Sequence, residues 1–168
     1  RTDMNKLYVT KIGGNVLDDE AALDKFLKDF ASIQAPKILI HGGGALATKI
    51  GNQLGIESKY VNGRRITDCQ TLDLVTMVYG GLINKQIVAH LQQWGCNALG
   101  VTGADGNMIK AVKRPVHDID FGHVGDITPD RVLPLLETSF GSWKAAPSSA
   151  APVTMPAAPQ PARRRIYL

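Results

Sequence analysis

The amino-acid sequence predicts an α/β fold, namely a three-layer sandwich around a mostly parallel central sheet. Two observations predict it. Strand-like and helix-like patterns alternate along residues 6–114, as is typical of parallel strands joined by helical crossovers. In addition, two predicted strands end in glycine pairs directly before a helix, in "KIGGN" and "HGGG". A length of 168 residues suffices for one ordinary domain, or for one lobe of something larger.

The first strand and helix follow from hydrophobic spacing. Residues 6–12 form a short apolar run that indicates a strand. Residues 18–33 indicate a helix, for which Asp18 or Asp19 supplies the N-cap. Its apolar stripe has the i, i+3, i+4, i+7 spacing and consists of Leu23, Phe26, Leu27 and Phe30.

The second strand, the second helix and a hairpin follow in order. Residues 37–41 are expected to form a buried strand, and residues 45–54 a helix that Gly55 ends. Asn62-Gly63 lies between two extended runs, which is the strongest short-range signal for a β-hairpin.

The remaining elements are one long helix, two strands and a last helix. Residues 70–94 indicate a helix that ends before Gly95, and its apolar residues lie on more than one side. Apolar residues on more than one side suggest that part of this helix packs against a second subunit, so we expect a homodimer. Strands are expected over 97–102 and 108–114, and Pro129 is expected to open a helix that ends near residue 136.

Charge and composition divide the chain near residue 139. Residues 1–138 carry 15 basic and 15 acidic residues, so the net charge of +4 comes from Lys144 and Arg163–Arg165. Because this charge does not cluster on a predicted folded face, we expect no nucleic-acid binding. Residues 139–168 are rich in Pro, Ala and Arg without helix or strand periodicity, so we expect a disordered or out-of-frame tail.

Cysteine usage and hydropathy indicate the cellular compartment of the protein. Cys69 and Cys96 lack metal-ligand spacing, and two buried free thiols are expected. The N-terminal residues do not resemble a signal peptide, and no apolar run approaches the length of a membrane span. The sequence therefore indicates a soluble, cytoplasmic protein without a membrane partner.

Three chemistries use a glycine run such as "HGGG". An esterase oxyanion loop also needs a G-x-S-x-G motif, which does not occur here. A dinucleotide fingerprint is matched by Gly42, Gly44 and Ala47, but a hairpin follows where that fold needs a strand with an acidic end.

The third chemistry is a phosphoryl cradle, which the first glycine pair favours. Lys11, Gly13 and Gly14 end the first strand in the same way that Gly42–Gly44 end the second. Glycine amides, helix N-termini and a lysine ammonium at the carboxyl ends of adjacent strands suit a multiply charged anion.

The motifs "KIGGN", "HGGG", "NGRRIT", "NKQI", "TGADG" and "GHVGDI", in this order and spacing, resemble the amino-acid kinase family. Within it they are most similar to the acetylglutamate kinases of arginine biosynthesis. The resemblance covers residues 6–138 and implies an acylglutamate-binding lobe over 1–138. No position after Glu137 matches the nucleotide lobe of this family, so that lobe is expected to be missing and the activity of the chain alone stays open.

The resemblance also implies residue roles. Lys11 matches the catalytic lysine that bridges the ATP phosphates, and Gly13–Gly14 match glycines that approach these phosphates. Gly43–Gly44 match backbone donors to the acylglutamate. Arg65 matches the arginine that holds its α-carboxylate, a grip that a planar guanidinium suits better than an ammonium group. Arg64 is expected to face solvent on the opposite side of the strand, and His123 is expected to be structural.

The implied reaction transfers the γ-phosphoryl group of ATP, with Mg²⁺, to the side-chain carboxylate of N-acetyl-L-glutamate or another N-acylglutamate such as the succinyl form. The sequence identifies no protein ligand for the metal ion. A carboxylate is already ionised at neutral pH, so positioning and charge stabilisation carry the catalysis. The alternatives are a non-catalytic acylglutamate-binding lobe and another amino-acid kinase that acts on aspartate, glutamate, carbamate or a nucleotide monophosphate.

Overall fold

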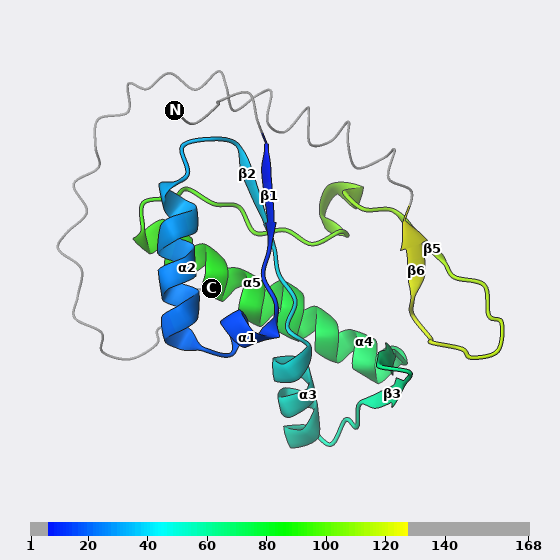
Figure 1. Ribbon diagram of the computed structural model, residues 1–168. Helices are drawn as coiled ribbons and strands as arrows, with labels where there is room; N and C mark the ends of the chain where they lie inside the picture. The colour runs from blue at the N-terminus through cyan, green and yellow to red at the C-terminus, as the bar shows by residue number, and fades with distance from the viewer. Residues whose placement is uncertain (1–6, 128–168) are drawn as a thin grey trace.

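The computed structural model describes residues 7–127, and strands and helices alternate along most of this range (Figure 1). The predicted α/β class is therefore confirmed. The strands are β1 (Tyr8–Lys11), β2 (Lys37–Ile40), β3 (Lys59–Val61), β4 (Arg64–Ile66), β5 (Ala111–Lys113) and β6 (Gly125–Ile127). The helices are α1 (Gly14–Leu17), α2 (Glu20–Ser32), α3 (Gly44–Gln53), α4 (Cys69–Val75), η1 (Thr76–Ile83), α5 (Asn84–Gln93) and η2 (Asp105–Asn107).

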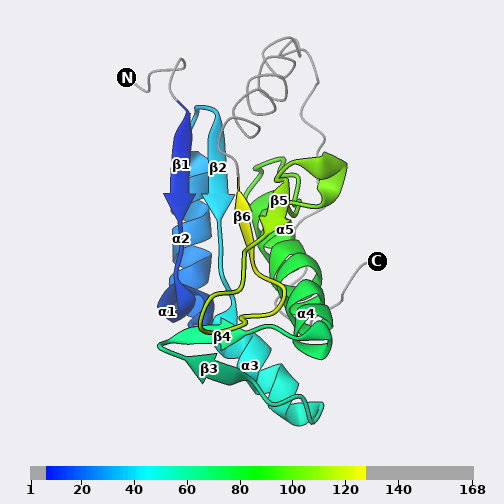
Figure 2. The ribbon, with the colours of Figure 1, turned by 90° about the vertical axis from the view of Figure 1, so that its right-hand side faces the viewer.

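Strands β1 and β2 form the parallel pair of the described residues, with Lys11 opposite Ile40. The Ile12 amide donates to the Ile40 carbonyl at 2.9 Å and so extends the pairing past β1. Figure 2 shows the two strands side by side with α2 behind them. No helix of residues 7–127 covers their other face, on which Val9 and Ile40 are 56% and 48% exposed. The expectation of a buried second strand is therefore wrong, because helix α2 covers one face of the pair only.

Helix α2 matches its prediction closely. Of the two candidate caps, Asp19 is the N-cap, and its carboxylate accepts from the amides of Ala21 and Ala22 at 3.0 Å each. Leu27 and Phe30 are buried, and the other two members of the predicted stripe pack against the core.

The β3–β4 hairpin turns at Asn62-Gly63, as predicted. Both residues have positive φ (51° and 73°), which suits a two-residue turn of this kind. The strands pair in the register Tyr60 opposite Arg65. Helix α3 also ends as predicted, because Gly55 follows it with φ of 74°.

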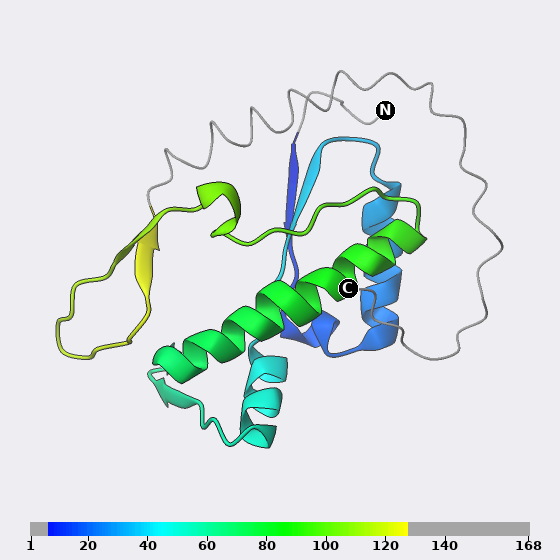
Figure 3. The same ribbon diagram turned by 180° about the vertical axis from the view of Figure 1, so that it is seen from behind.

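The predicted long helix is one continuous run of three segments, α4, η1 and α5 (Figure 3). Asp68 caps its start by accepting from the Thr71 amide at 2.8 Å, and Gly95 follows its end with φ of 73°. The middle segment, η1, is π-helical, which the hydrophobic pattern does not predict. A π-helical segment widens the turn and shifts the side chains around the axis.

The expectation of a strand over 97–102 is wrong. The segment has no regular secondary structure and pairs with no strand of the described residues. Three of its carbonyls instead accept from side chains of α5, in the pairs Gln92–Ala98, Lys85–Gly100 and Asn84–Val101. A Cβ on Gly80 would lie 2.9 Å from Thr102 Cγ2, so the helix and the segment approach closely. Three carbonyls that could accept in a strand ladder are therefore bonded to the helix.

The predicted strand over 108–114 is shorter in the structure and pairs antiparallel with a partner from later in the chain, as β5 with β6. The Arg114 guanidinium donates to the Asp126 carboxylate across this pair at 2.8 Å. The helix expected from Pro129 and the tail over 139–168 lie outside the described residues.

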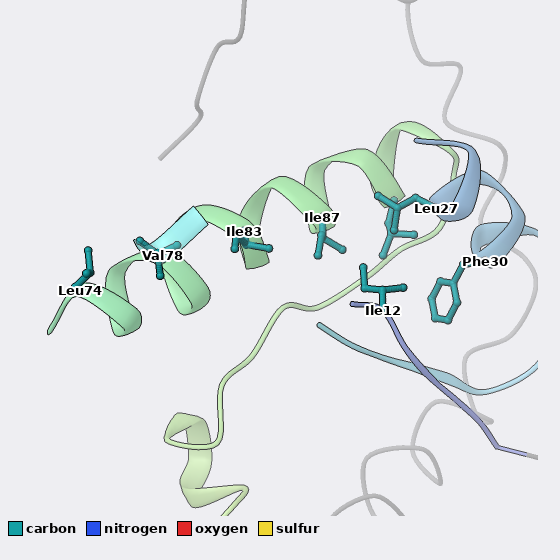
Figure 4. Packing of buried hydrophobic residues seen from close by; sticks show 9 residues of the cluster. Ile12, Leu27, Phe30, Leu74, Val78, Ile83 and Ile87 are labelled. Carbon is teal, nitrogen blue, oxygen red and sulfur yellow. The ribbon is translucent and has the colours of Figure 1, made fainter. Parts of the chain in front are cut away.

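The hydrophobic core lies between β1, α2 and the long helix (Figure 4). Ile12 points from the end of β1 toward Leu27 and Phe30 of α2 and toward Ile87 of α5. Leu74, Val78 and further buried residues continue the core along the long helix. None of the helices within residues 7–127 combines the length and apolar character that a membrane crossing needs.

Candidate active site

Both glycine turns leave the sheet at the same end. Because β1 and β2 are parallel and Lys11 lies opposite Ile40, Gly13–Gly14 and Gly42–Gly44 follow neighbouring strand ends. Lys11 is exposed there, and neither an ion pair nor a side-chain hydrogen bond joins it to another residue of 7–127. The structure thus brings together Lys11 and both predicted glycine pairs at the carboxyl ends of the strands.

The helices that begin at these turns have no side chain to cap them. Gly13 is the N-cap of α1 and Gly43 is the N-cap of α3, and neither provides a side-chain acceptor. The first amide N–H groups of a helix have no partner within the helix. The free N–H groups at both turns can donate to an anion, and the ten-residue helix α3 adds the positive end of its dipole.

The two turns need glycine for different reasons. Gly13 has φ of −97° and an added Cβ would meet no atom within 4 Å, so packing within the described chain does not require glycine there. Gly43 has φ of +153°, and a Cβ would collide with Ile83 Cδ1 and lie 3.1 Å from the Tyr79 ring. The backbone at Gly13 is thus open to a ligand, whereas the fold itself requires glycine at position 43.

Arg65 connects the hairpin to the second glycine turn. Its Nη2 lies 2.9 Å from the Gly44 carbonyl, 2.8 Å from Thr48 Oγ1 and 2.7 Å from the Tyr60 hydroxyl, and these three acceptors share its two hydrogens. Its Nε donates to the same Tyr60 hydroxyl at 3.1 Å. Nη1 is buried and has no hydrogen-bond partner within residues 7–127. Arg65, the last of the predicted site residues, therefore lies against the start of α3 with one donor group unused.

The predicted site residues did not include Thr48 and Tyr60, although signals for both exist. Asn62-Gly63 fixes a two-residue turn, and counting outward from it places Tyr60 opposite Arg65. Thr48 lies four residues after Gly44, one helical turn along α3. Burial raises the pKa of the Tyr60 phenol, but hydrogen bonds with Thr48 and Arg65 and the charge of Arg65 outweigh it, so the pKa is lowered overall.

Arg64 is exposed on the opposite side of β4, as predicted. Its guanidinium also lies over the ring of Phe121, with 4.1 Å between Cζ and the ring centroid. Next to this contact, Thr67 and Gly122 form an isolated parallel bridge. These contacts attach the base of the hairpin to residues 121–123.

His123 contacts the start of the long helix. Its Nε2 lies 3.4 Å from Cys69 Sγ, and its amide donates to the Thr67 carbonyl at 2.7 Å. Both cysteines are free thiols, as predicted, but Cys69 is exposed and Cys96 is half-buried. The expectation that both are buried is wrong, because Cys69 is the first residue of α4 and lies outside the core.

The comparison with family models is decisive for ancestry. The model of the amino acid kinase family matches residues 6–141. The chain belongs to this family. The matched range contains all the predicted site residues: Lys11, Gly13, Gly14, Gly43, Gly44 and Arg65.

Several curated relatives in this family are named acetylglutamate kinase. The Bacteroides thetaiotaomicron protein is 63% identical over 122 residues, which are 73% of this chain and 48% of that protein. The Bacteroides fragilis protein is 62% identical over 122 residues, or 73% and 47% of the two chains. The Cytophaga hutchinsonii protein is 58% identical over 134 residues, or 79% and 51%. The chain therefore spans about half the length of the curated relatives it matches.

Solved structures agree on the fold. N-acetylglutamate synthase from Neisseria gonorrhoeae aligns with a TM-score of 0.62 at 23% identity, over 81% of this chain and 31% of that chain. The protein smu.665 from Streptococcus mutans aligns with a TM-score of 0.62 at 24% identity, over 79% and 55% of the two chains. These similarities support the α/β fold of the amino-acid kinase family.

Proposed function

We propose that this chain carries the acylglutamate lobe of an enzyme that phosphorylates the side-chain carboxylate of N-acetyl-L-glutamate with MgATP, a step of arginine biosynthesis. Identities of 58–63% to relatives named acetylglutamate kinase support this substrate. The geometric observation that carries it is the arrangement at the ends of β1 and β2: two helix starts without side-chain caps, with Lys11 exposed beside them.

In this proposal the two turns hold the two reactants. Lys11 and the amides of Gly13–Gly14 contact the ATP phosphates, and Lys11 stabilises the transferring phosphoryl group. The amides of Gly43–Gly44 donate to the acylglutamate, and Arg65 holds its α-carboxylate. The attacking side-chain carboxylate is ionised at neutral pH, so no residue has to remove a proton. The chain contributes positioning and positive charge.

Trapping of the product tests the reaction. The 168-residue chain is incubated with MgATP, N-acetyl-L-glutamate and hydroxylamine, which converts an acyl phosphate to a coloured hydroxamate. Hydroxamate that forms only when both substrates are present would show that the chain is catalytic without the rest of its relatives' length. Aspartate and glutamate as acceptors test the other carboxyl kinases of the family, and should give none.

The same experiment separates catalysis from binding alone. Calorimetric binding of N-acetyl-L-glutamate without any hydroxamate would assign the chain as a non-catalytic acylglutamate-binding lobe. Absence of both binding and hydroxamate would refute the proposed substrate.

We extend the proposal to the assembly and its surroundings. The domain comprises residues 1–138, followed by a tail over 139–168, and its complete sheet is a mostly parallel layer between two helical layers. A homodimer in the cytoplasm is proposed, with the long helix in the interface. Met77, which is 55% exposed on η1, supports this interface. Sedimentation equilibrium of the chain measures the oligomeric state.

A further inference from the structure

Arg65 is held in place without losing its charge. All the acceptors of its hydrogen bonds are neutral: the carbonyl of Gly44 and the hydroxyls of Thr48 and Tyr60. Within residues 7–127, no carboxylate lies within ion-pair distance of its guanidinium. Arg114 offers the contrast, because the Asp126 carboxylate pairs with it. The charge of Arg65 thus remains available to a ligand.

The hydroxyls form a chain that ends at the first turn of α3. Thr48 donates to the Gly44 carbonyl at 2.9 Å, and 2.9 Å separates Thr48 Oγ1 from the Tyr60 hydroxyl. When the Thr48 proton points to Gly44, the Tyr60 proton has Thr48 Oγ1 as its acceptor. The Tyr60 oxygen then faces Arg65 with its lone pairs and accepts from Nε and Nη2. Both hydroxyls thus donate and accept, and together with the Gly44 carbonyl they hold the guanidinium in place.

The group left over is Nη1, which is buried and has no acceptor in the part of the chain that the structure describes. A buried donor without a partner costs free energy, and a carboxylate is the acceptor that a guanidinium binds most strongly. The neighbouring start of α3 adds free N–H groups of the same polarity. The unused donor therefore matches an anionic ligand group.

We infer that Tyr60 and Thr48 are positioning residues, whose hydroxyls hold Arg65 so that Nη1 is available to the α-carboxylate of the ligand. The inference rests on the proposed function, since it takes an acylglutamate as the ligand. It adds that a neutral pair of hydroxyls, from the hairpin and from α3, sets the preference for a ligand acid over its amide.

Calorimetry with two ligands tests the inference on the 168-residue chain. The ligands are N-acetyl-L-glutamate and its α-amide, which lacks the charge that Arg65 binds. Tyr60→Phe and Thr48→Val each remove one hydroxyl at nearly constant shape. Each variant is expected to bind N-acetyl-L-glutamate about tenfold more weakly, as for loss of a hydrogen bond to a charged group. The affinity for the α-amide should not change, so the preference for the acid shrinks.

Matched variants separate this role from a general effect on folding. Tyr8→Phe removes a hydroxyl that makes no hydrogen bond within residues 7–127, and should leave both affinities unchanged. Thr48→Ser keeps the hydroxyl and should keep the preference for the acid. If Tyr60→Phe fails to fold, the Thr48→Val and Thr48→Ser pair gives the same comparison.

The outcomes distinguish the two proposals. An unchanged acid preference in Tyr60→Phe and Thr48→Val would overturn the positioning role while the proposed function stands. Equal weakening of acid and amide would overturn it as well, because a structural role predicts that result. If the unaltered chain bound neither ligand, the proposed function and this inference would both fall.

Discussion

Helices α1 to α4 begin in two ways, and the difference follows their place in the fold. Helices α2 and α4 begin at Asp19 and Asp68, whose carboxylates accept from first-turn amides. Helices α1 and α3 begin at Gly13 and Gly43 without a side-chain acceptor. The glycine starts are the two that follow the parallel strands.

This contrast separates stability from binding. An aspartate cap satisfies the helix start internally and repels a second anion. A glycine start leaves its amides to water or to a ligand, at a small cost in stability. In the proposed function, the capped starts stabilise helices that take no part in binding, and the open starts lie where Lys11 and Arg65 add positive charge.

The largest expected effect is on turnover. Lys11→Ala should lower hydroxamate formation from MgATP and N-acetyl-L-glutamate about 100- to 1000-fold, because a pre-placed donor to the transferring group is lost. Lys25→Ala, on the exposed side of the Asp-capped helix α2, is the matched control and should keep full turnover. Near-normal turnover in Lys11→Ala would show that Lys11, beside the uncapped helix starts, has no catalytic role.

The two glycine starts should themselves respond differently to an added methyl group. Gly43→Ala should lower the free energy of unfolding by about 2–4 kcal/mol, since the new Cβ collides with Ile83 at a φ unsuited to alanine. In Gly13→Ala the added Cβ has no atom within 4 Å, so the free energy of unfolding should change by less than about 0.5 kcal/mol. Urea unfolding measures both. Equal losses would mean that packing explains both glycines.

Much of this arrangement could be predicted from local sequence signals. Asn62-Gly63 specifies its turn almost alone, because few residue pairs accept two positive φ values in succession. Parallel strands bring their carboxyl ends to one edge, so the meeting of the two glycine turns follows once the strands are recognised. The Tyr60–Arg65 pairing was available from the same turn.

The rest depends on tertiary partners that the sequence does not identify. Residues 97–102 have strand composition, but a strand exists only when another strand pairs with it, and here the side chains of α5 bind the carbonyls. The widened turn of η1 places Tyr79 and Ile83 against Gly43, and helical periodicity does not foresee this contact. The contact of Arg64 with Phe121 joins residues far apart in the chain.

A smaller effect is expected at the capped start of α2. Asp19→Ala removes the acceptor of two amides and should lower the free energy of unfolding by about 1 kcal/mol. Asp18→Ala, one residue earlier, removes an exposed carboxylate that accepts no hydrogen bond within residues 7–127 and serves as the control. Hydroxamate formation should be the same in both variants. Loss of activity in Asp19→Ala at full stability would contradict the division between capped and open starts.

The smallest effect is a pH dependence at the other capped start. The Thr71 amide, then the Thr71 side chain, and the charges of Lys59 and His123 hold the pKa of Asp68 below its ordinary value against the opposing effect of burial. Because the folded pKa lies below the unfolded one, the carboxylate contributes its stability fully above the unfolded value of about 4 and loses it as the pH falls through the folded value. Asp68→Asn keeps an acceptor at the cap but does not titrate. The free energy of unfolding of the unaltered chain, measured in urea from pH 7 to pH 3, should therefore fall relative to that of Asp68→Asn only at the acid end. Parallel curves for the two proteins would show that the charge of Asp68 does not contribute to the stability of the cap. The contrast with the glycine starts would then depend on hydrogen bonding alone.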